Sequence, residues 1–258
     1  MPRKPSPKKA KKAKKIIDWN PPPWTLSDTI QLFMLTVALM TMVLTVEDII
    51  FGEKGTLAHW PEPTITGILY AMQTMTLLGP LYIFTRLKHN TEWKLFGFRR
   101  VKPRQVMVKI AQGYLFYYLA SAIFLQIKMS FQTEIPGYGE QASHIPLFGG
   151  TDAGVILGGV IIVFIAPIVE ELFFRGYVHQ VLKKYTNTVL ASTGSAFIFT
   201  LFHFEFQVFI PIFILGLVLS WMYEKTNSLW TPISFHILNN GFAFLIEVAI
   251  FYEWISAI

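Results

Sequence analysis

The 258-residue sequence contains no cysteine, and only 15% of its residues are charged. The missing cysteine excludes disulfides, thiolate zinc sites and a cysteine nucleophile. Soluble globular domains carry about 25% charged residues, so the low charge argues against a soluble enzyme and against a disordered chain. The abundant residues are apolar, since 53% are hydrophobic and 16% are aromatic. This composition predicts an integral membrane protein with little chain left for a soluble domain.

Long apolar runs recur along the chain, on the scale needed to cross the ~30 Å hydrocarbon core of a bilayer. Because an isolated helix satisfies its own backbone hydrogen bonds in lipid, these runs predict an all-α, polytopic transmembrane helical bundle. No strand-like alternation indicates a barrel, and no internal repeat is evident. Seven spans are expected, near residues 27–46, 64–85, 106–126, 153–173, 188–204, 207–223 and 229–251.

Basic residues are concentrated in alternate connecting segments. With the N-terminus inside, twenty of the 22 Lys and Arg residues fall on the inner side, and only Lys54 and Lys128 fall outside. This bias predicts a cytoplasmic N-terminus and an outer C-terminus. We divide the chain into a basic cytoplasmic tail, 1–25, and a transmembrane domain, 26–258. The tail lacks a signal-peptide cleavage site, and we interpret it as a segment that fixes orientation in the lipid bilayer rather than a tether to nucleic acid or anionic lipid.

An acidic pair, Glu170 and Glu171, follows the fourth apolar run. An ionisable residue inside a span costs roughly 2.5–3.5 kcal/mol on insertion scales, so its presence requires a reason. Glu171 and Arg175 are four residues apart on one helical face and can form an ion pair. Glu170 points about 100° away from Glu171 and has no local partner, which suits it to proton transfer. The alternative is an interfacial charge cluster at a helix end.

Two histidines and an asparagine are the other polar groups within apolar runs. His203 follows an aromatic segment, and His236 and Asn240 are four residues apart, so they project from one helical face. Asn239 points elsewhere and is expected to serve helix packing. Each histidine alone is more often a packed residue. Together with Glu170, however, these residues from three spans predict one convergent site facing the interior of the bundle.

Counting residues from the inner helix ends gives an estimate of the depth of each group. At 1.5 Å per residue, Glu170 and His203 lie at similar depths, roughly 22 and 25 Å from the inner ends. His236 and Asn240 lie only roughly 10–17 Å from theirs. The count therefore predicts that the second pair is nearer the cytoplasm.

These side chains are of the types that could hydrolyse a bond by activating a water. Glu170 and His203 could deprotonate the water, which would attack a peptide carbonyl, and His236 and Asn240 could donate hydrogen bonds to the oxyanion. Glu, His and His could alternatively hold zinc. The sequence has no HExxH motif and asparagine is a poor fourth ligand, so we favour a site without metal or another cofactor.

Three short motifs resemble those of the CPBP family, which comprises type II CAAX prenyl endopeptidases and bacteriocin-processing or abortive-infection relatives. The motifs are EELFFRG (170–176), FTLFH (199–203) and HILNN (236–240), and they match the family patterns EExxxR, FxxxH and HxxxN. The resemblance covers about residues 150–245, the expected catalytic core. It implies a glutamate-type intramembrane endopeptidase. In that family's terms Glu170 and His203 would activate water, His236 and Asn240 would hold the oxyanion, and Glu171 and Arg175 would support the site.

The resemblance also implies a class of substrate, and the basic N-terminal tail and the small number of spans suggest a location. The substrate would be a membrane-associated protein or peptide, whose prenylation the motifs do not fix, and the protein would lie in a bacterial plasma membrane. Two alternatives stay open. One is a non-catalytic family member that acts as a scaffold, an immunity factor or a chaperone. The other is a proton-coupled transporter, against which the missing inverted repeat argues.

Overall fold

The structure is a computed structural model that describes residues 20–51, 55–57, 59–131, 134–139 and 141–256. In these segments all regular elements are helical, which confirms the all-α class. Residues 1–19 of the predicted basic tail lie outside the described residues. The α-helices are α1 (Leu26–Phe51), α2 (Glu62–Tyr82), α3 (Pro103–Phe131), α4 (Asp152–Gly158), α5 (Ala166–Phe173), α6 (His179–Tyr185), α7 (Thr188–Leu201), α8 (Phe209–Thr226) and α9 (Trp230–Phe251).

Short turns of other helix types join or interrupt these elements. Three are wide π turns, η1 (Ile83–Leu87), η4 (Gly159–Ile165) and η5 (Phe174–Val178). The other three are 3₁₀ turns, η2 (Trp93–Phe96), η3 (Ile145–Phe148) and η6 (Phe206–Val208). Because η4 and η5 continue the helix on both sides of α5, the segment from α4 to α6 forms one long rod, Asp152–Tyr185.

Six of the seven predicted spans correspond to helices that are long and apolar enough to cross a membrane. The exception is the span predicted at 188–204. Its helix, α7, has 14 residues and a length of about 21 Å, less than the ~30 Å of a bilayer core. The helix ends at Leu201 because the chain then turns through Phe204, whose φ of 53° lies in the left-handed region. His203 therefore lies in a turn and not within a helix.

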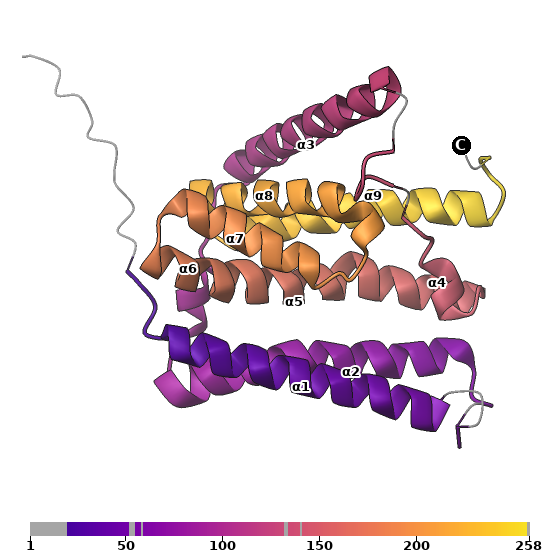
Figure 1. Cartoon of the computed structure of the whole chain (residues 1–258), viewed down its shortest axis with the longest axis horizontal. Helices are drawn as coiled ribbons and strands as arrows, with labels where there is room; N and C mark the ends of the chain where they lie inside the picture. Colours follow the sequence, from indigo (N-terminus) through magenta and orange to yellow (C-terminus); the bar gives the residue numbers. More distant parts are fainter. Residues whose placement is uncertain (1–19, 52–54, 58, 132–133, 140, 257–258) are drawn as a thin grey trace, which may run out of the picture.

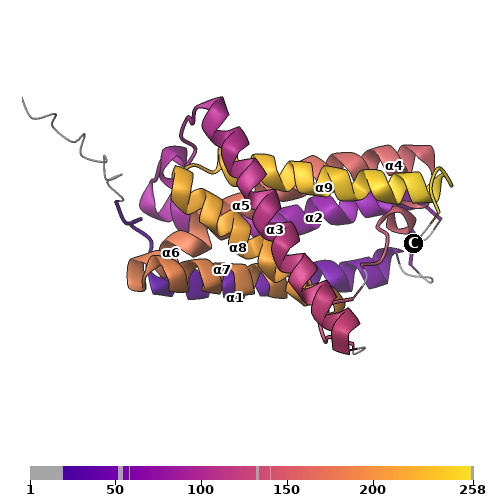
Figure 2. The same ribbon diagram turned by 90° about the horizontal axis from the view of Figure 1, so that it is seen from above.

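The helices pack in layers around the α4–α6 rod. Helices α1 and α2 contact each other along their lengths and form one side of the molecule, at the bottom of Figure 1. Helices α7, α8 and α9 cover the opposite side of the rod, and α3 crosses the outer surface of α8 and α9 diagonally (Figure 2). This arrangement encloses α5 between α2 on one side and α9 on the other.

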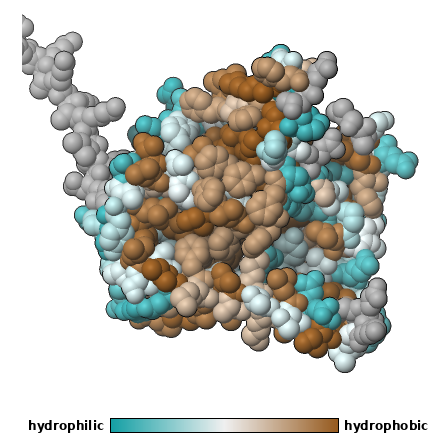
Figure 3. Space-filling model, in the orientation of Figure 1, coloured by the Kyte–Doolittle hydropathy of each residue, from teal (hydrophilic) through white to brown (hydrophobic). Residues whose placement is uncertain are grey.

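The molecular surface matches that of a membrane protein. A broad hydrophobic band covers the middle of the face seen in Figure 3, and hydrophilic residues gather toward the two ends of the bundle. Bulky apolar side chains on the outer helices are exposed, including Met34 at 68% and Met107 at 70%. The ends of α2, α6 and α8, with their basic connecting segments, gather where α1 begins (Figure 1). The predicted membrane orientation stays a prediction.

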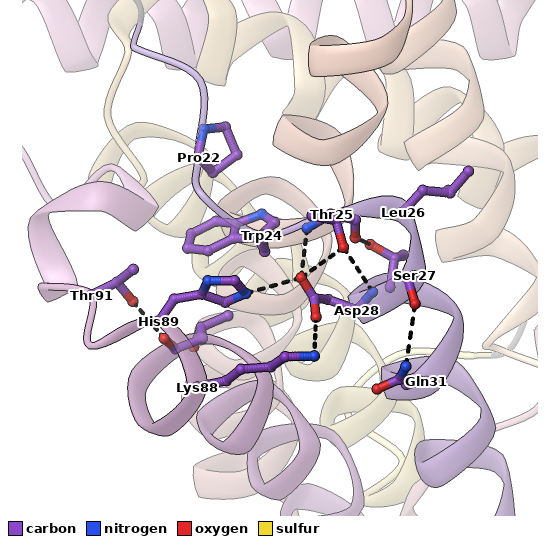
Figure 4. Close-up of polar contacts among 12 residues, drawn as sticks. Pro22, Trp24, Thr25, Leu26, Ser27, Asp28, Gln31, Lys88, His89 and Thr91 are labelled. Carbon is purple, nitrogen blue, oxygen red and sulfur yellow. Dashed lines mark hydrogen bonds and ion pairs between the residues drawn. The ribbon is translucent and has the colours of Figure 1, made fainter.

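The chain preceding α1 is fixed by aromatic and polar contacts. The ring of Trp24 is stacked between Phe96 and Tyr177, with a centroid distance of 5.3 Å to each. Asp28, in the first turn of α1, is only 2% exposed, and its carboxylate accepts contacts from Lys88 at 2.6 Å and His89 at 2.9 Å (Figure 4). This junction ties the start of α1 to the residues that follow α2.

Candidate active site

The acidic pair lies on α5, between two stretches of wide helix. In the first of these, η4, the backbone N–H of Ala166 bonds to the carbonyl of Ile161, five residues back. Pro167 follows and has no N–H, so the same pattern leaves the carbonyl of Ile162 without a main-chain donor. Such π turns are frequent at functional sites because they re-aim side chains and free backbone groups.

A single cavity of about 470 Å³ contains all four residues for which we predicted a direct role. Its walls come mainly from α2, the α4–α6 rod, the turn after α7, α8 and α9. Glu170, His203, His236 and Asn240 are among the lining residues. The convergence expected from the sequence is therefore present in the structure.

Glu170 and His236 are neighbours within this cavity. The Oε2 atom of Glu170 lies 3.7 Å from Nε2 of His236, and the Glu170 side chain is 22% exposed. The depth count, which placed His236 nearer the cytoplasm than Glu170, is therefore wrong. That count assumed that all helices start at one level and run straight.

Glu171 and Arg175 form the buried ion pair that the i,i+4 spacing predicted. Nη1 of Arg175 donates to Oε1 of Glu171 at 2.8 Å, and both side chains are inaccessible to solvent. Nη2 of Arg175 donates to the carbonyl of Gly216 on α8 at 3.0 Å, and the guanidinium lies 4.5 Å from the ring centroid of Phe199. The pair thus connects α5 with α7 and α8.

The imidazole of His236 is fixed by this pair. Its Nδ1 lies 3.0 Å from Oε1 of Glu171. A carboxylate that already pairs with a guanidinium accepts hydrogen bonds, so Nδ1 carries a proton and donates it. The other nitrogen, Nε2, is the one that faces Glu170.

The imidazole of His203 is fixed by its own chain. Its Nδ1 lies 2.8 Å from the carbonyl oxygen of Phe199, and the two rings pack with centroids 4.5 Å apart. A carbonyl can only accept, so Nδ1–H is the donor. Neutral His203 therefore has an unprotonated Nε2, the form of a base.

The two neighbouring asparagines differ from the prediction in an informative way. Nδ2 of Asn240 donates to the carbonyl of Ile162 at 3.1 Å, which satisfies the group freed by Pro167. Asn239 was expected to point elsewhere and serve packing, but it lines the same cavity. Both asparagines therefore reach the cavity, at three and four residues after His236 on α9.

Other cavity residues were not singled out from the sequence. His144, in the segment between α3 and α4, contacts Glu247 of α9, with Nδ1 2.9 Å from Oε1. Glu205, in the turn after α7, also lines the cavity. Glu247 carried a usable signal, because it is a carboxylate within the last apolar run. Glu205 and His144 lie in connecting segments, where a charged residue needs no special reason.

The hydrogen bond to Glu247 raises the pKa of His144 above its ordinary value, although burial of the imidazole opposes it. The charges of Glu247 and Glu205 act in the same direction as the hydrogen bond. A zinc site was the alternative interpretation of the same side chains. Among the described residues, no group of three His, Asp or Glu side chains is arranged to hold a metal ion.

Comparison with known proteins points to one family. Residues 152–242 match the model of the type II CAAX prenyl endopeptidase Rce1-like family. The chain is 29% identical over 174 residues to the membrane-embedded CAAX protease MroQ of Staphylococcus aureus, covering 62% of this chain and 60% of that protein. It is 25% identical over 128 residues to the putative membrane peptidase YdiL of Bacillus subtilis, covering 49% of this chain and 52% of that protein. The match thus spans little more than half the length of either relative. No solved structure matches the chain.

Proposed function

We propose, from the match of residues 152–242 to the model of the type II CAAX prenyl endopeptidase Rce1-like family, that the chain is a member of this family and an intramembrane endopeptidase. Its substrate is a membrane-associated protein or peptide, in which it hydrolyses a peptide bond. One observation carries the proposal. One cavity, among helices of membrane-spanning length, is lined by Glu170, His203, His236 and Asn240. These residues come from sequence positions up to 70 residues apart.

In the proposed reaction, Glu170 and His203 bind and activate a water. The carboxylate of Glu170 accepts one of its hydrogen bonds, and the unprotonated Nε2 of His203 is available to accept the other. One proton moves from the water to this pair as the oxygen attacks the carbonyl carbon of the peptide bond. The C–N bond then breaks, and the same proton is delivered to the leaving nitrogen. The products are a carboxylic acid and an amine, and the acid then gives its proton to the amine, which leaves a carboxylate and an ammonium group.

Asn240 and His236 stabilise the oxyanion that forms during the attack. Asn240 has two N–H groups on Nδ2 and uses one on the carbonyl of Ile162, so the second is left for the oxyanion. His236 already donates from Nδ1, and it donates from Nε2 when the ring is protonated. Preorganised donors of this kind contribute a large part of the catalysis in acyl-transfer enzymes.

Glu171 and Arg175 position the imidazole of His236. Both side chains are enclosed by protein, so they act through His236 and do not contact the substrate. The carboxylate of Glu171 holds Nδ1 of His236 and so fixes the orientation of the ring. We also propose that the basic end of the bundle faces the cytoplasm of a bacterial cell, with the N-terminus inside.

Terminal-peptide mapping of membrane proteins tests the proposed function. Membranes from cells that produce the wild-type protein are compared with membranes from cells that produce Glu170→Ala or His203→Ala at equal abundance. Some new protein termini should depend on the wild-type protein and decrease about 100-fold or more in both variants, because each variant removes part of the acid–base pair.

Ile168→Ala is the matched control, since Ile168 is on the same helix and 40% exposed on its surface. It should leave the termini unchanged. If Glu170→Ala and His203→Ala both give the same termini as wild type, the endopeptidase proposal is wrong. A scaffold or immunity role would then account for the family membership, and solute flux in proteoliposomes would indicate a transporter.

A further inference from the structure

Two adjacent asparagines on α9 have different hydrogen-bonding states. Asn240 is held by the carbonyl of Ile162, which Pro167 leaves without a main-chain donor. The carboxamide of Asn239 makes no hydrogen bond to any residue that the structure describes, yet it lines the cavity. The NH₂ group and the carbonyl oxygen of Asn239 are therefore both available to a molecule that enters the cavity.

The position of Asn239 on α9 places it close to the substrate peptide bond that is cleaved. It follows His236 by three residues, which is about 4.5 Å along the helix axis. The rise of an extended peptide is about 3.3 Å per residue. A substrate chain lying along α9 with its scissile carbonyl near His236 therefore brings a neighbouring peptide group to Asn239.

The cavity extends far enough along α9 to hold such a chain. Its lining residues on this helix run from His236 through Ala243 to Glu247. These eleven residue steps correspond to about 16 Å, enough for about five extended residues. The same face of the helix thus carries the proposed oxyanion donors and the free carboxamide.

The chemistry of a carboxamide matches that of a peptide group. Its NH₂ donates to a carbonyl oxygen, and its oxygen accepts from an N–H. No recognition of a particular side chain is needed for this pairing. We propose that Asn239 binds the backbone of the substrate about one residue from the scissile bond and holds it extended along α9. This inference rests on the proposed endopeptidase function and adds the residue that positions the chain.

The experiment uses the purified full-length protein in lipid nanodiscs. The probe is a quenched fluorogenic peptide that spans the bond whose cleavage depends on Glu170 in the terminal-peptide mapping. Asn239→Ala should raise KM about tenfold, as expected for the loss of one or two hydrogen bonds, and leave kcat within about twofold. Leu238→Ala, at a neighbouring position that is 50% exposed and outside the cavity lining, is the control and should leave both constants unchanged.

A second series separates backbone binding from a structural role. Peptides are made with an ester in place of each of the three amides on either side of the scissile bond, which removes one N–H at a time. One ester should raise KM for the wild-type protein and have no further effect on Asn239→Ala, because the partner of that N–H is already gone.

The outcomes distinguish the two proposals. If Asn239→Ala cleaves the probe with the wild-type KM, or if every ester has the same effect on both proteins, Asn239 does not bind the backbone and the endopeptidase function stands. If no terminus in the membranes depends on Glu170, the endopeptidase function and this inference both fail.

Discussion

Nδ1 of His236 lies 3.0 Å from Oε1 of Glu171, the same oxygen that accepts the hydrogen bond from Arg175. All three side chains are at most 2% exposed. The second oxygen of Glu171 is buried and has no hydrogen-bond partner among the described residues. One carboxylate oxygen therefore links a buried cation to the imidazole of the proposed site, and stability and catalysis are expected to depend on the same atom.

Removing the carboxylate should destabilise the protein strongly. Glu171→Leu leaves Arg175 buried without its counter-ion, and breaking a buried pair in this way typically costs about 3–5 kcal/mol. The loss is measured as the change in the free energy of unfolding in detergent micelles. A variant as stable as wild type would show that the pair does not hold these helices together.

The double variant Glu171→Leu/Arg175→Met separates the two effects of this pair. Replacing both charges by apolar groups of similar size should restore most of the stability, because no uncompensated charge is left. Cleavage should stay low, since Nδ1 of His236 has lost its partner. Unfolding and cleavage are measured on the same preparations. Recovery of both quantities would contradict the role of Glu171 in positioning His236.

The contact between His144 and Glu247 should make stability depend on pH. The pKa of His144 is raised in the folded protein, chiefly by its hydrogen bond to Glu247. The contact therefore contributes fully below the unfolded pKa of about 6.5, and its contribution is lost as the pH rises through the folded pKa. The thermal midpoint of wild type should fall over that range, and His144→Gln should remove this part of the fall.

His59→Gln is the matched control for this measurement, because His59 is exposed and forms no ion pair with another described residue. Its profile should follow that of wild type. The groups that face His144 come from two other parts of the chain, Glu247 on α9 and Glu205 after α7. A profile of His144→Gln that coincides with wild type across this range would assign the pH dependence to another group.

The sequence predicted the elements whose causes are local. Apolar runs of sufficient length specify helices in lipid, and the spacing of Glu171 and Arg175 specifies their pairing on one face. Three short motifs were enough to indicate the family and the residues that converge. All of these features depend on composition or on intervals of three or four residues.

The features that the sequence did not predict depend on long-range packing or on turn geometry. The contact between Glu171 and His236 joins residues 65 positions apart, so no local interval reveals it. Asn239 was assigned to packing because an ideal helix directs adjacent residues to different faces. In the structure Asn239 and Asn240 both line the cavity, because positions three and four residues after His236 lie on neighbouring parts of one helical face.

The buried carboxylate of Asp28 should stabilise the junction between α1 and the end of α2. It contacts Lys88, His89 and Thr25 (Figure 4). Asp28→Ala removes these contacts and should lower the free energy of unfolding by about 1–3 kcal/mol, in the range for a lost buried hydrogen-bonding group. Gln31→Ala is the control, because its bond to Ser27 is exposed and should contribute little. Equal losses in the two variants would contradict this assignment.

Gly216 should be required for the close approach of α7 and α8. A Cβ atom at this position would lie 3.0 Å from Cα of Ala196 and 3.3 Å from the ring of Phe199. Because the first of these atoms belongs to the backbone, Gly216→Ala should force the helices apart and cost about 1–3 kcal/mol. Gly79→Ala is the matched control, since a Cβ there meets no atom within 4 Å and alanine favours a helix.

The same substitution should affect catalysis through a chain of contacts. The carbonyl of Gly216 accepts from Arg175, and the carbonyl of Phe199 holds Nδ1 of His203. A shift of α7 away from α8 would therefore move the proposed base relative to Glu170. Since catalysis depends more sharply than substrate binding on the position of the base, Gly216→Ala should reduce kcat more than KM, whereas Gly79→Ala should change neither. Loss of stability with an unchanged kcat would show that His203 keeps its position independently of this helix contact.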